Sequence, residues 1–205
     1  PGMPCSPRQL VMALPLFLCL ATAVLRPVAA ENMDVRPGDM VFGEASAPIT
    51  IIEYYSLNCP HCAEFHKLIF PVLKTKYIDS GQIRFVFRDF PLNWSAVEAA
   101  VLAQCAGPER YLAAQDALFT SLRQWSAAEP SLLAIAEIVE TVGVTRAKLK
   151  RCVNEGELEK QVLQNFEFAK EELGINTAPT FFIDGEKHVG GISLESLAEI
   201  LEQAD

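Results

Sequence analysis

The chain has 205 residues and a formal net charge of −9 at pH 7, with 26 acidic against 17 basic residues. This balance argues against a nucleic-acid-binding protein, because contacts to phosphates draw on lysine and arginine. Half of the residues are hydrophobic, which is enough for the core of one large domain, or of a small domain that carries an insertion.

Residues 1–30 have the pattern of a secretory signal peptide. Arg8 precedes an apolar stretch over 10–25, and the small residues that follow predict cleavage near Ala30. Since the chain does not begin with Met, we expect translation to start at Met3 or the chain to be a fragment. No later segment is apolar for long enough to span a membrane, so we expect an exported protein that is soluble after cleavage.

The next segment alternates strands with one helix. Strands are predicted at 40–43 and 49–55, and the second should be central because it is apolar nearly throughout. A helix is predicted from Cys59 or Cys62 to about Tyr77, followed by a strand over 83–87.

A helical pattern then replaces the strands over residues 91–173, which predicts an all-helical insertion. Ser95 and Glu98 have the spacing of a capping box for its first helix. Trp94 and Trp125 are expected to pack within the insertion. Further helices are predicted at 111–125, from Pro130 to about Gly143, from Thr145 through Cys152, and at 158–173.

Strand signals return at 180–183, and Asp184-Gly185 predicts a turn into a second strand at 187–189. A helix that begins after Ser193 closes the chain. The α/β order is therefore strand, helix, strand, helical insertion, hairpin and helix.

The sequence Cys59-Pro60-His61-Cys62 lies at the turn between the strand over 49–55 and the helix after it. Two thiols at this spacing can close a reversible disulfide. The sulfur at the start of the helix faces unpaired backbone N–H groups and the positive end of the helix dipole, which favour its thiolate. Such a thiolate has a pKa of roughly 3.5 to 7.5. Cys59 is therefore predicted to be the reactive cysteine and Cys62 the resolving one, with a protonated His61 adding to the effect.

The same motif has three other interpretations. A c-type haem site is excluded, because His would have to follow Cys62 and position 63 is Ala. A zinc or copper site would need further ligands, and His66, four residues after Cys62, is the candidate. Two cysteines that merely share a turn are the third possibility.

Four motifs of the chain belong together: Glu53-Tyr54-Tyr55-Ser56, Cys59-Pro60-His61-Cys62, Phe87-Arg88-Asp89-Phe90-Pro91 and Ala178-Pro179-Thr180-Phe181-Phe182. With the long helical segment, they resemble a DsbA-type thiol:disulfide oxidoreductase, in particular the alphaproteobacterial DsbA-like proteins. The resemblance implies a thioredoxin-like fold with a large all-helical insertion, in which residues 31–90 and 174–205 form the thioredoxin-like domain and 91–173 the insertion.

The resemblance also implies roles for residues of the site. Pro179 matches a cis-proline that faces the active disulfide, and the backbone around Ala178 would pair with an extended substrate. Ala178 is neither the Val frequent in oxidases nor the Thr frequent in isomerases, which leaves that preference open. Glu53 would be a buried acid that manages the proton of Cys62. Lys74 or Lys76 would pair with this buried acid. The alternative is that Glu53 is an exposed strand residue. His66 and His188 are expected at the surface or one layer behind the reacting groups.

Cys105 and Cys152 lie 47 positions apart, a spacing that suits no metal motif. They match a second disulfide found in the helical domain of some DsbA-like relatives. Such a bridge would stabilise the insertion by roughly 4 kcal/mol in the chain-entropy model. A shuttle that exchanges with the active pair is the alternative.

The function predicted is that of an exported oxidase, which donates the Cys59–Cys62 disulfide to folding proteins with free thiols. It would need no cofactor or metal, act as a monomer, and be re-oxidised by a DsbB-type membrane protein. The chain lacks an ER-retention tetrapeptide, so a periplasm is predicted. The alternatives are a disulfide isomerase or reductase, a copper-delivery module, and a glutathione-dependent transferase, against which Cys62 argues.

Overall fold

The computed structural model describes Gly2 and residues 33–203. The predicted signal peptide, residues 1–30 with cleavage near Ala30, lies outside this part of the chain. Within the described residues no helix is both long enough and apolar enough to cross a membrane.

A five-stranded sheet of order β1-β3-β2-β4-β5 forms the centre of the molecule. Its strands β2 and β3 run parallel, and every other neighbouring pair is antiparallel. As predicted, the apolar strand β2 is central and almost wholly buried. The strands are β1 (Met40–Phe42), β2 (Ile49–Tyr55), β3 (Ile83–Asp89), β4 (Thr180–Ile183) and β5 (Glu186–Val189).

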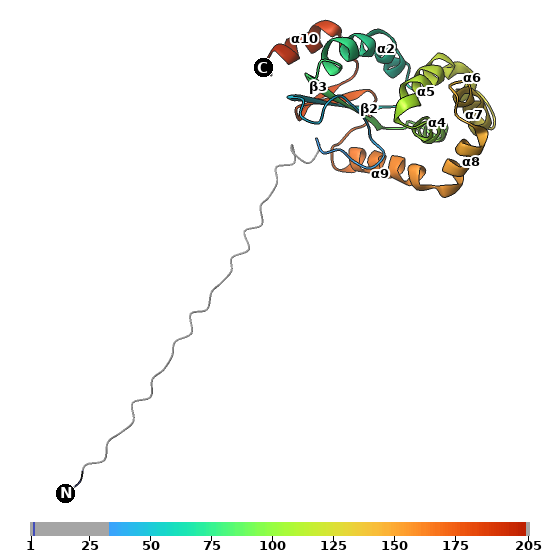
Figure 1. Cartoon of the computed structure of the whole chain (residues 1–205), viewed down its shortest axis with the longest axis horizontal. Helices are drawn as coiled ribbons and strands as arrows, with labels where there is room; N and C mark the ends of the chain where they lie inside the picture. Colours follow the sequence, from blue (N-terminus) through green and yellow to red (C-terminus); the bar gives the residue numbers. More distant parts are fainter. Residues whose placement is uncertain (1, 3–32, 204–205) are drawn as a thin grey trace.

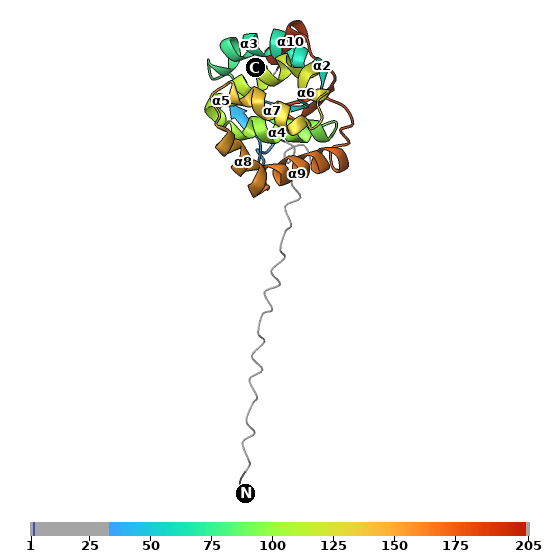
Figure 2. The same cartoon turned by 90° about the vertical axis from the view of Figure 1, so that its right-hand side faces the viewer.

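Helices cover both faces of this sheet, and a group of helices gathers at one end of it (Figure 1, Figure 2). On one face lie α2 (Pro60–Leu68), α3 (Phe70–Leu73), a π-helical turn (Lys74–Ile78) and α10 (Leu194–Gln203). Between β3 and β4 the chain forms α4 (Trp94–Cys105), α5 (Pro108–Thr120), α6 (Leu122–Ser126), α7 (Ser131–Glu140), α8 (Arg146–Glu155) and α9 (Glu157–Glu171). Of these, α4 contacts α5, α7, α8 and α9, and α9 also packs against β3.

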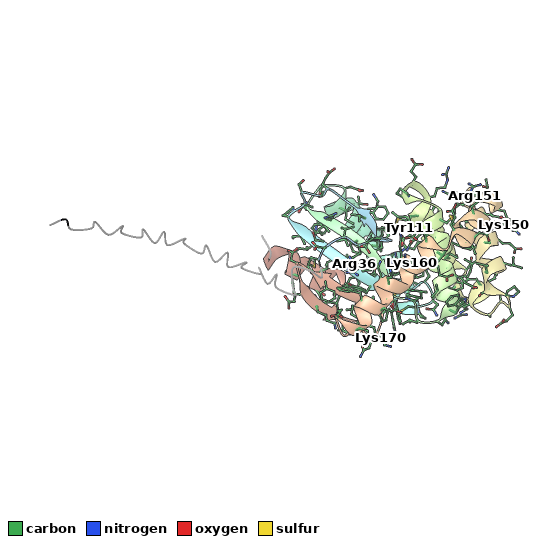
Figure 3. All side chains as sticks on the ribbon, turned by 90° about the horizontal axis from the view of Figure 1, so that it is seen from below. Arg36, Tyr111, Lys150, Arg151, Lys160 and Lys170 are labelled. Carbon is green, nitrogen blue, oxygen red and sulfur yellow. A yellow bond between two sulfur atoms is a disulfide. The ribbon has the colours of Figure 1, made fainter. Side chains whose placement is uncertain are left out.

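The helices meet the sheet through aromatic side chains. Tyr111 of α5 is fully buried where sheet and helices join (Figure 3), and its ring lies 6.3 Å from that of Phe42 and 5.9 Å from that of Phe87. This packing fixes the helical part against the strands that carry the cysteine motif.

Two of the predicted helices are each divided into shorter ones. The helix expected from Cys59 to Tyr77 is interrupted at Ile69, because Pro71 has no N–H for the helical hydrogen bond and its ring clashes with the preceding turn. The helix expected over 111–125 is divided at Ser121 into α5 and α6. The indole N–H of Trp125 in α6 donates to the carbonyl oxygen of Leu118 in the last turn of α5.

The capping box is also wrong. Asn93, not Ser95, caps α4, and its Oδ1 accepts from the N–H of Ala96 at 3.0 Å. Glu98 accepts a hydrogen bond from Ser131 and so joins α4 to α7. Trp94 does not pack inside: it is 57% exposed at the start of α4. Trp125 is fully buried, as predicted.

Candidate redox site

Cys59 and Cys62 lie where β2 turns into α2. Cys59 is the N-cap residue of α2, and its Sγ accepts a hydrogen bond from the N–H of Cys62 at 3.4 Å. Pro60 occupies the first turn, where its missing N–H costs no helical hydrogen bond. Cys59 keeps 4% of its surface exposed and Cys62 none, so an incoming thiol can reach only Cys59.

The two thiols have opposite acidities. The pKa of Cys59 is lowered to about 6, first by the hydrogen bond from the side chain of Cys62, and further by the N–H groups of Cys62 and His61 and the charge of His61. The pKa of Cys62 is raised well above 9.0, mainly by burial, and also by its hydrogen bond to Cys59 and the charge of Glu53. The surroundings therefore favour a thiolate at Cys59 and a thiol at Cys62.

A cis peptide bond faces this pair. The bond between Ala178 and Pro179 is cis, and the thiol of Cys59 donates to the carbonyl oxygen of Ala178 at 3.3 Å. Thr180 pairs with Tyr54 in the antiparallel ladder of β4 and β2, which brings the start of β4 to the end of β2. The backbone beside Cys59 is thus irregular and outside the sheet.

Glu53 is fully buried beneath α2, so the alternative of an exposed strand residue is wrong. Its Oε2 lies 3.2 Å from Nε2 of His66, while its Oε1 has no hydrogen-bond partner within the described residues. Burial raises the pKa of Glu53, and the charge and hydrogen bond of His66 lower it. Lys74 is not the partner but pairs with Asp79, and Lys76 lies over the ring of Tyr77.

The three histidines differ in how far they are exposed to solvent. The side chain of His66 is only 7% exposed and lies against Glu53, so of its two expected places it takes the one behind the reacting groups and not the one at the surface. The side chain of His61 is 77% exposed and lies 3.9 Å from the carboxylate of Glu64. His188 is half-buried on the edge strand β5. The described residues contain no cluster of three His, Cys, Asp or Glu that could hold a metal ion.

Cys105 and Cys152 form a disulfide with an S–S distance of 2.04 Å, which joins α4 to α8. Cys59 and Cys62 are free thiols. The four cysteines of the described residues therefore form two pairs: a disulfide between two helices of the insertion, and a reduced pair at the start of α2.

A buried polar group that the sequence did not indicate lies at the end of β3. Asp89 is 3% exposed and accepts a hydrogen bond from Nε2 of Gln104 at 2.6 Å. Burial raises its pKa to about 7, against the hydrogen bonds from Gln104 and Tyr55. The hydroxyls of Tyr55 and Tyr111 are 2.5 Å apart, so the network continues into α5. The sequence offered one clue, an acid at the end of an apolar strand.

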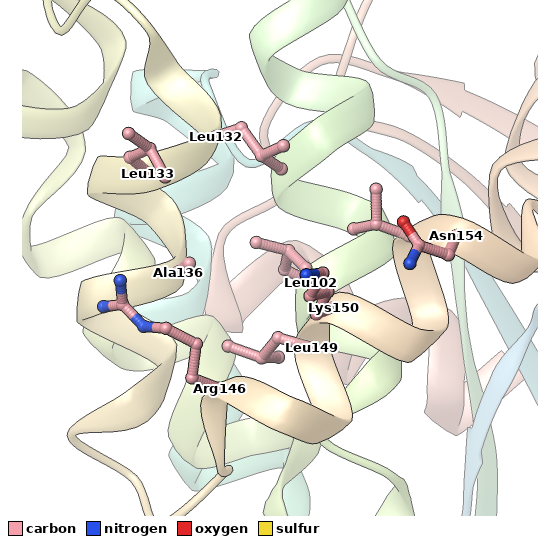
Figure 4. Close-up of a pocket in the computed structure, with 9 residues that line it drawn as sticks. Leu102, Leu132, Leu133, Ala136, Arg146, Leu149, Lys150 and Asn154 are labelled. Carbon is pink, nitrogen blue, oxygen red and sulfur yellow. The ribbon is translucent and has the colours of Figure 1, made fainter.

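Two of the hollows on the described surface lie beside α2 and among the helices of the insertion. One of about 300 Å³ opens beside α2 and is lined by His61, Glu64, Phe65, Leu68, Ile69, Gly191, Ile192 and Ser193. The other, of about 260 Å³, lies among α4, α7 and α8 (Figure 4) and is lined by Leu102, Leu132, Leu133, Ala136, Arg146, Leu149, Lys150, Val153 and Asn154. Only the first adjoins the cysteine motif.

Comparison with known proteins shows the family of the chain. A family model for thioredoxin matches residues 35–203. A protein of Rickettsia bellii named for protein-disulfide oxidoreductase activity is 28% identical over 89% of this chain and 75% of its own length. One of Rickettsia felis, named likewise, is 29% identical over 88% of the chain, which spans only 64% of that relative.

Solved structures agree with the family model. The structure of alpha-DsbA1 from Wolbachia pipientis has 30% identity and a TM-score of 0.78, and the match covers 87% of this chain and 96% of that one. A thioredoxin-like oxidoreductase from Silicibacter pomeroyi has 25% identity and a TM-score of 0.66 over 82% of this chain and 92% of that one.

Proposed function

Since the chain belongs to the thioredoxin family, as a DsbA-like protein-disulfide oxidoreductase, we propose that it donates the Cys59–Cys62 disulfide to exported proteins as they fold. The predicted thioredoxin-like fold with its helical insertion is confirmed. The proposal also includes export to the periplasm, a monomeric state and a DsbB-type partner. It further includes the division of the chain into a thioredoxin-like domain, residues 31–90 with 174–205, and an insertion, residues 91–173.

The observation that carries the proposal is the difference between the two sulfurs. Cys59 is accessible and its thiolate is stabilised, with a pKa of about 6, whereas Cys62 is fully buried with a raised pKa. A stabilised thiolate favours the reduced pair over the disulfide, and so makes the disulfide a good oxidant. It is also the better leaving group.

The exchange then proceeds in two steps. A substrate thiolate attacks Sγ of Cys59, the bond between Cys59 and Cys62 breaks, and its electron pair goes to Sγ of Cys62, which takes up a proton. A second substrate thiolate attacks the substrate sulfur of the mixed disulfide, and Cys59 leaves as a thiolate. Two electrons have passed from the substrate to the pair, which a membrane oxidase of the DsbB type would remove.

The neighbouring groups have roles within this proposal. Pro60 holds the start of α2, and the exposed His61 supplies positive charge near Cys59. The backbone around Ala178 and Pro179 would pair with an extended substrate. Glu53 would exchange the proton of Cys62. The disulfide of Cys105 and Cys152 would stabilise the helices.

The deciding experiment is the reduction potential of the Cys59–Cys62 pair in glutathione buffers, with the Cys105–Cys152 disulfide followed separately by mass spectrometry. A value near about −120 mV supports a dedicated oxidant, because that is the range of DsbA. A value below about −200 mV would instead indicate a reductase or isomerase.

A further inference from the structure

Glu53 and His66 form a nearly inaccessible titratable pair beside the cysteines. The side chain of Glu53 is 0% exposed and that of His66 is 7% exposed, with 3.2 Å between Oε2 and Nε2. The charge of Glu53 reaches Cys62, whose pKa it raises. His66 thus lies between a fully buried acid and the edge of the protein interior.

Apolar and aromatic groups surround His66. The titratable groups that face this region are Glu53 and Tyr55 from β2, Asp89 from β3 and Tyr111 from α5; on α2 itself, His61 and Glu64 point into solvent. The rings around the imidazole belong to Tyr55, Phe65, Phe70, Phe87 and Phe119. The rings hold the imidazole in place and keep bulk water away from Glu53.

We propose that His66 carries protons between Glu53 and solvent, and so sets the charge of Glu53 each time the cysteine pair changes redox state. His66 is a positioning residue, since it acts on the reacting sulfur through Glu53. The inference rests on the proposed function, which it deepens by naming the route of the proton.

The proton balance gives the reason. When the bond between Cys59 and Cys62 breaks, Sγ of Cys62 receives the electron pair and takes the proton of the Glu53 carboxyl group. The carboxylate left behind takes a proton from the imidazolium of His66, which regains one from solvent. Re-oxidation runs the same transfers backwards. A buried carboxylate without such a partner would carry an uncompensated charge.

An imidazole is suited to this route because either ring nitrogen can hold the proton. One nitrogen faces Glu53, and the ring can take up a proton at the other before releasing the first.

The test compares wild type with His66→Gln, which keeps a hydrogen-bond donor for Glu53 but exchanges no proton near neutral pH. The protein, with its Cys105–Cys152 disulfide intact, is oxidised, and its rate of oxidation of a reduced two-cysteine peptide is measured from about pH 5 to 9. We expect H66Q to lower the rate at pH 7 by about tenfold, and by less than about twofold in a Glu53→Gln background. Lys67→Gln, on the exposed side of α2, should leave the profile unchanged.

A second measurement needs no change at His66. The imidazole resonances of His66 are titrated by NMR in the oxidised and the reduced protein. We expect the midpoints to differ by at least about half a unit, because Cys62 changes from disulfide to thiol beside Glu53, and we expect Glu53→Gln to remove the difference.

The outcomes separate this inference from the proposed function. Equal midpoints in the two redox states, or an H66Q profile that follows wild type while the peptide is oxidised, would overturn the role of His66 and leave the oxidase standing. A wild type that does not oxidise the peptide would refute the oxidase, and the His66 titrations would still decide the coupling.

Discussion

Replacement of Cys62 by Ala is expected to raise the pKa of Cys59. The hydrogen bond from the side chain of Cys62 is the largest contribution that lowers this pKa to about 6. A hydrogen bond to a charged group contributes about 1.5 to 3 kcal/mol, which corresponds to about one to two pKa units. Because Cys59 retains some contact with solvent, we expect the lower end, an increase of about one unit.

Cys62→Ser is the matched control, since its hydroxyl can donate to Cys59 in place of the thiol. Each reduced variant, with the Cys105–Cys152 disulfide intact, is alkylated with iodoacetamide at a series of pH values, and modification at Cys59 is quantified by mass spectrometry. The rate should have its midpoint near pH 6 in wild type. The midpoint should lie close to this value in C62S and about one unit higher in C62A.

A C62A midpoint at or below that of wild type would refute this reasoning. The low pKa of Cys59 would then have to come from the helix N-terminus and the charge of His61 alone.

Three further changes test the structure away from the reactive sulfur. The folded protein holds the proton of Asp89 up to a pKa of about 7, whereas the unfolded chain loses it near 3.8, so wild type should lose stability as pH rises from about 4 to 7. Asp89→Asn should remove this loss, which is worth at most about 4 kcal/mol. Urea unfolding at pH 4.5 and 8 measures the difference. Replacing both Cys105 and Cys152 by Ala should lower the free energy of unfolding by up to about 4 kcal/mol, since their disulfide closes a loop with a sequence separation of 47, and leave peptide oxidation unchanged. Gly43→Ala should destabilise the protein by about 2 to 3 kcal/mol, because a Cβ there would lie 2.3 Å from a backbone oxygen of β3.

Controls distinguish these effects from general ones. Asp116 is exposed on α5, so Asp116→Asn should leave the pH dependence of stability as it is. Gly190 also has a positive φ, +91°, but no atom within 4 Å of an added Cβ, so Gly190→Ala should cost only the backbone strain of about 1 to 2 kcal/mol. Loss of peptide oxidation after removal of Cys105 and Cys152 would favour the shuttle over a structural disulfide.

Local signals in the sequence were sufficient for the strands and for the start of α2. The apolar run of β2 and the Cys59-Pro60-His61-Cys62 motif both lie within a few residues, so their consequences do not depend on distant parts of the chain. The break after Ile69 was also readable, because Pro71 stands inside the expected helix. The cap of α4 was predicted wrongly, because Asn93, two residues before Ser95, also has a side chain that can accept from the first turn of a helix.

Contacts between distant elements explain what the sequence could not provide. His66 was noted for its spacing from Cys62, yet its partner depends on how α2 lies over β2. Trp94 lies in a segment that was correctly predicted to be helical. It is, however, the first residue of α4, and its side chain stays exposed there. In the sequence Asp89 marks the end of a strand. Its burial depends on α4 and α5, since Gln104 of α4 donates to it and Tyr111 of α5 lies near its charge.

Two buried carboxylates near the central strands, those of Asp39 and Glu53, differ in how many of their oxygens have a hydrogen-bond partner. Asp39 receives two hydrogen bonds from the guanidinium of Arg88, at 2.8 and 2.6 Å, and Arg88 in turn donates to the hydroxyl of Tyr54. Glu53, one position before Tyr54 and therefore on the opposite face of the sheet, has one oxygen beside His66 and one with no hydrogen-bond partner within the described residues. A fully paired carboxylate stabilises a fold, whereas a half-paired one costs free energy. Because the costly carboxylate is the one on the side of Cys62, the fold keeps its least satisfied acid where a proton must move.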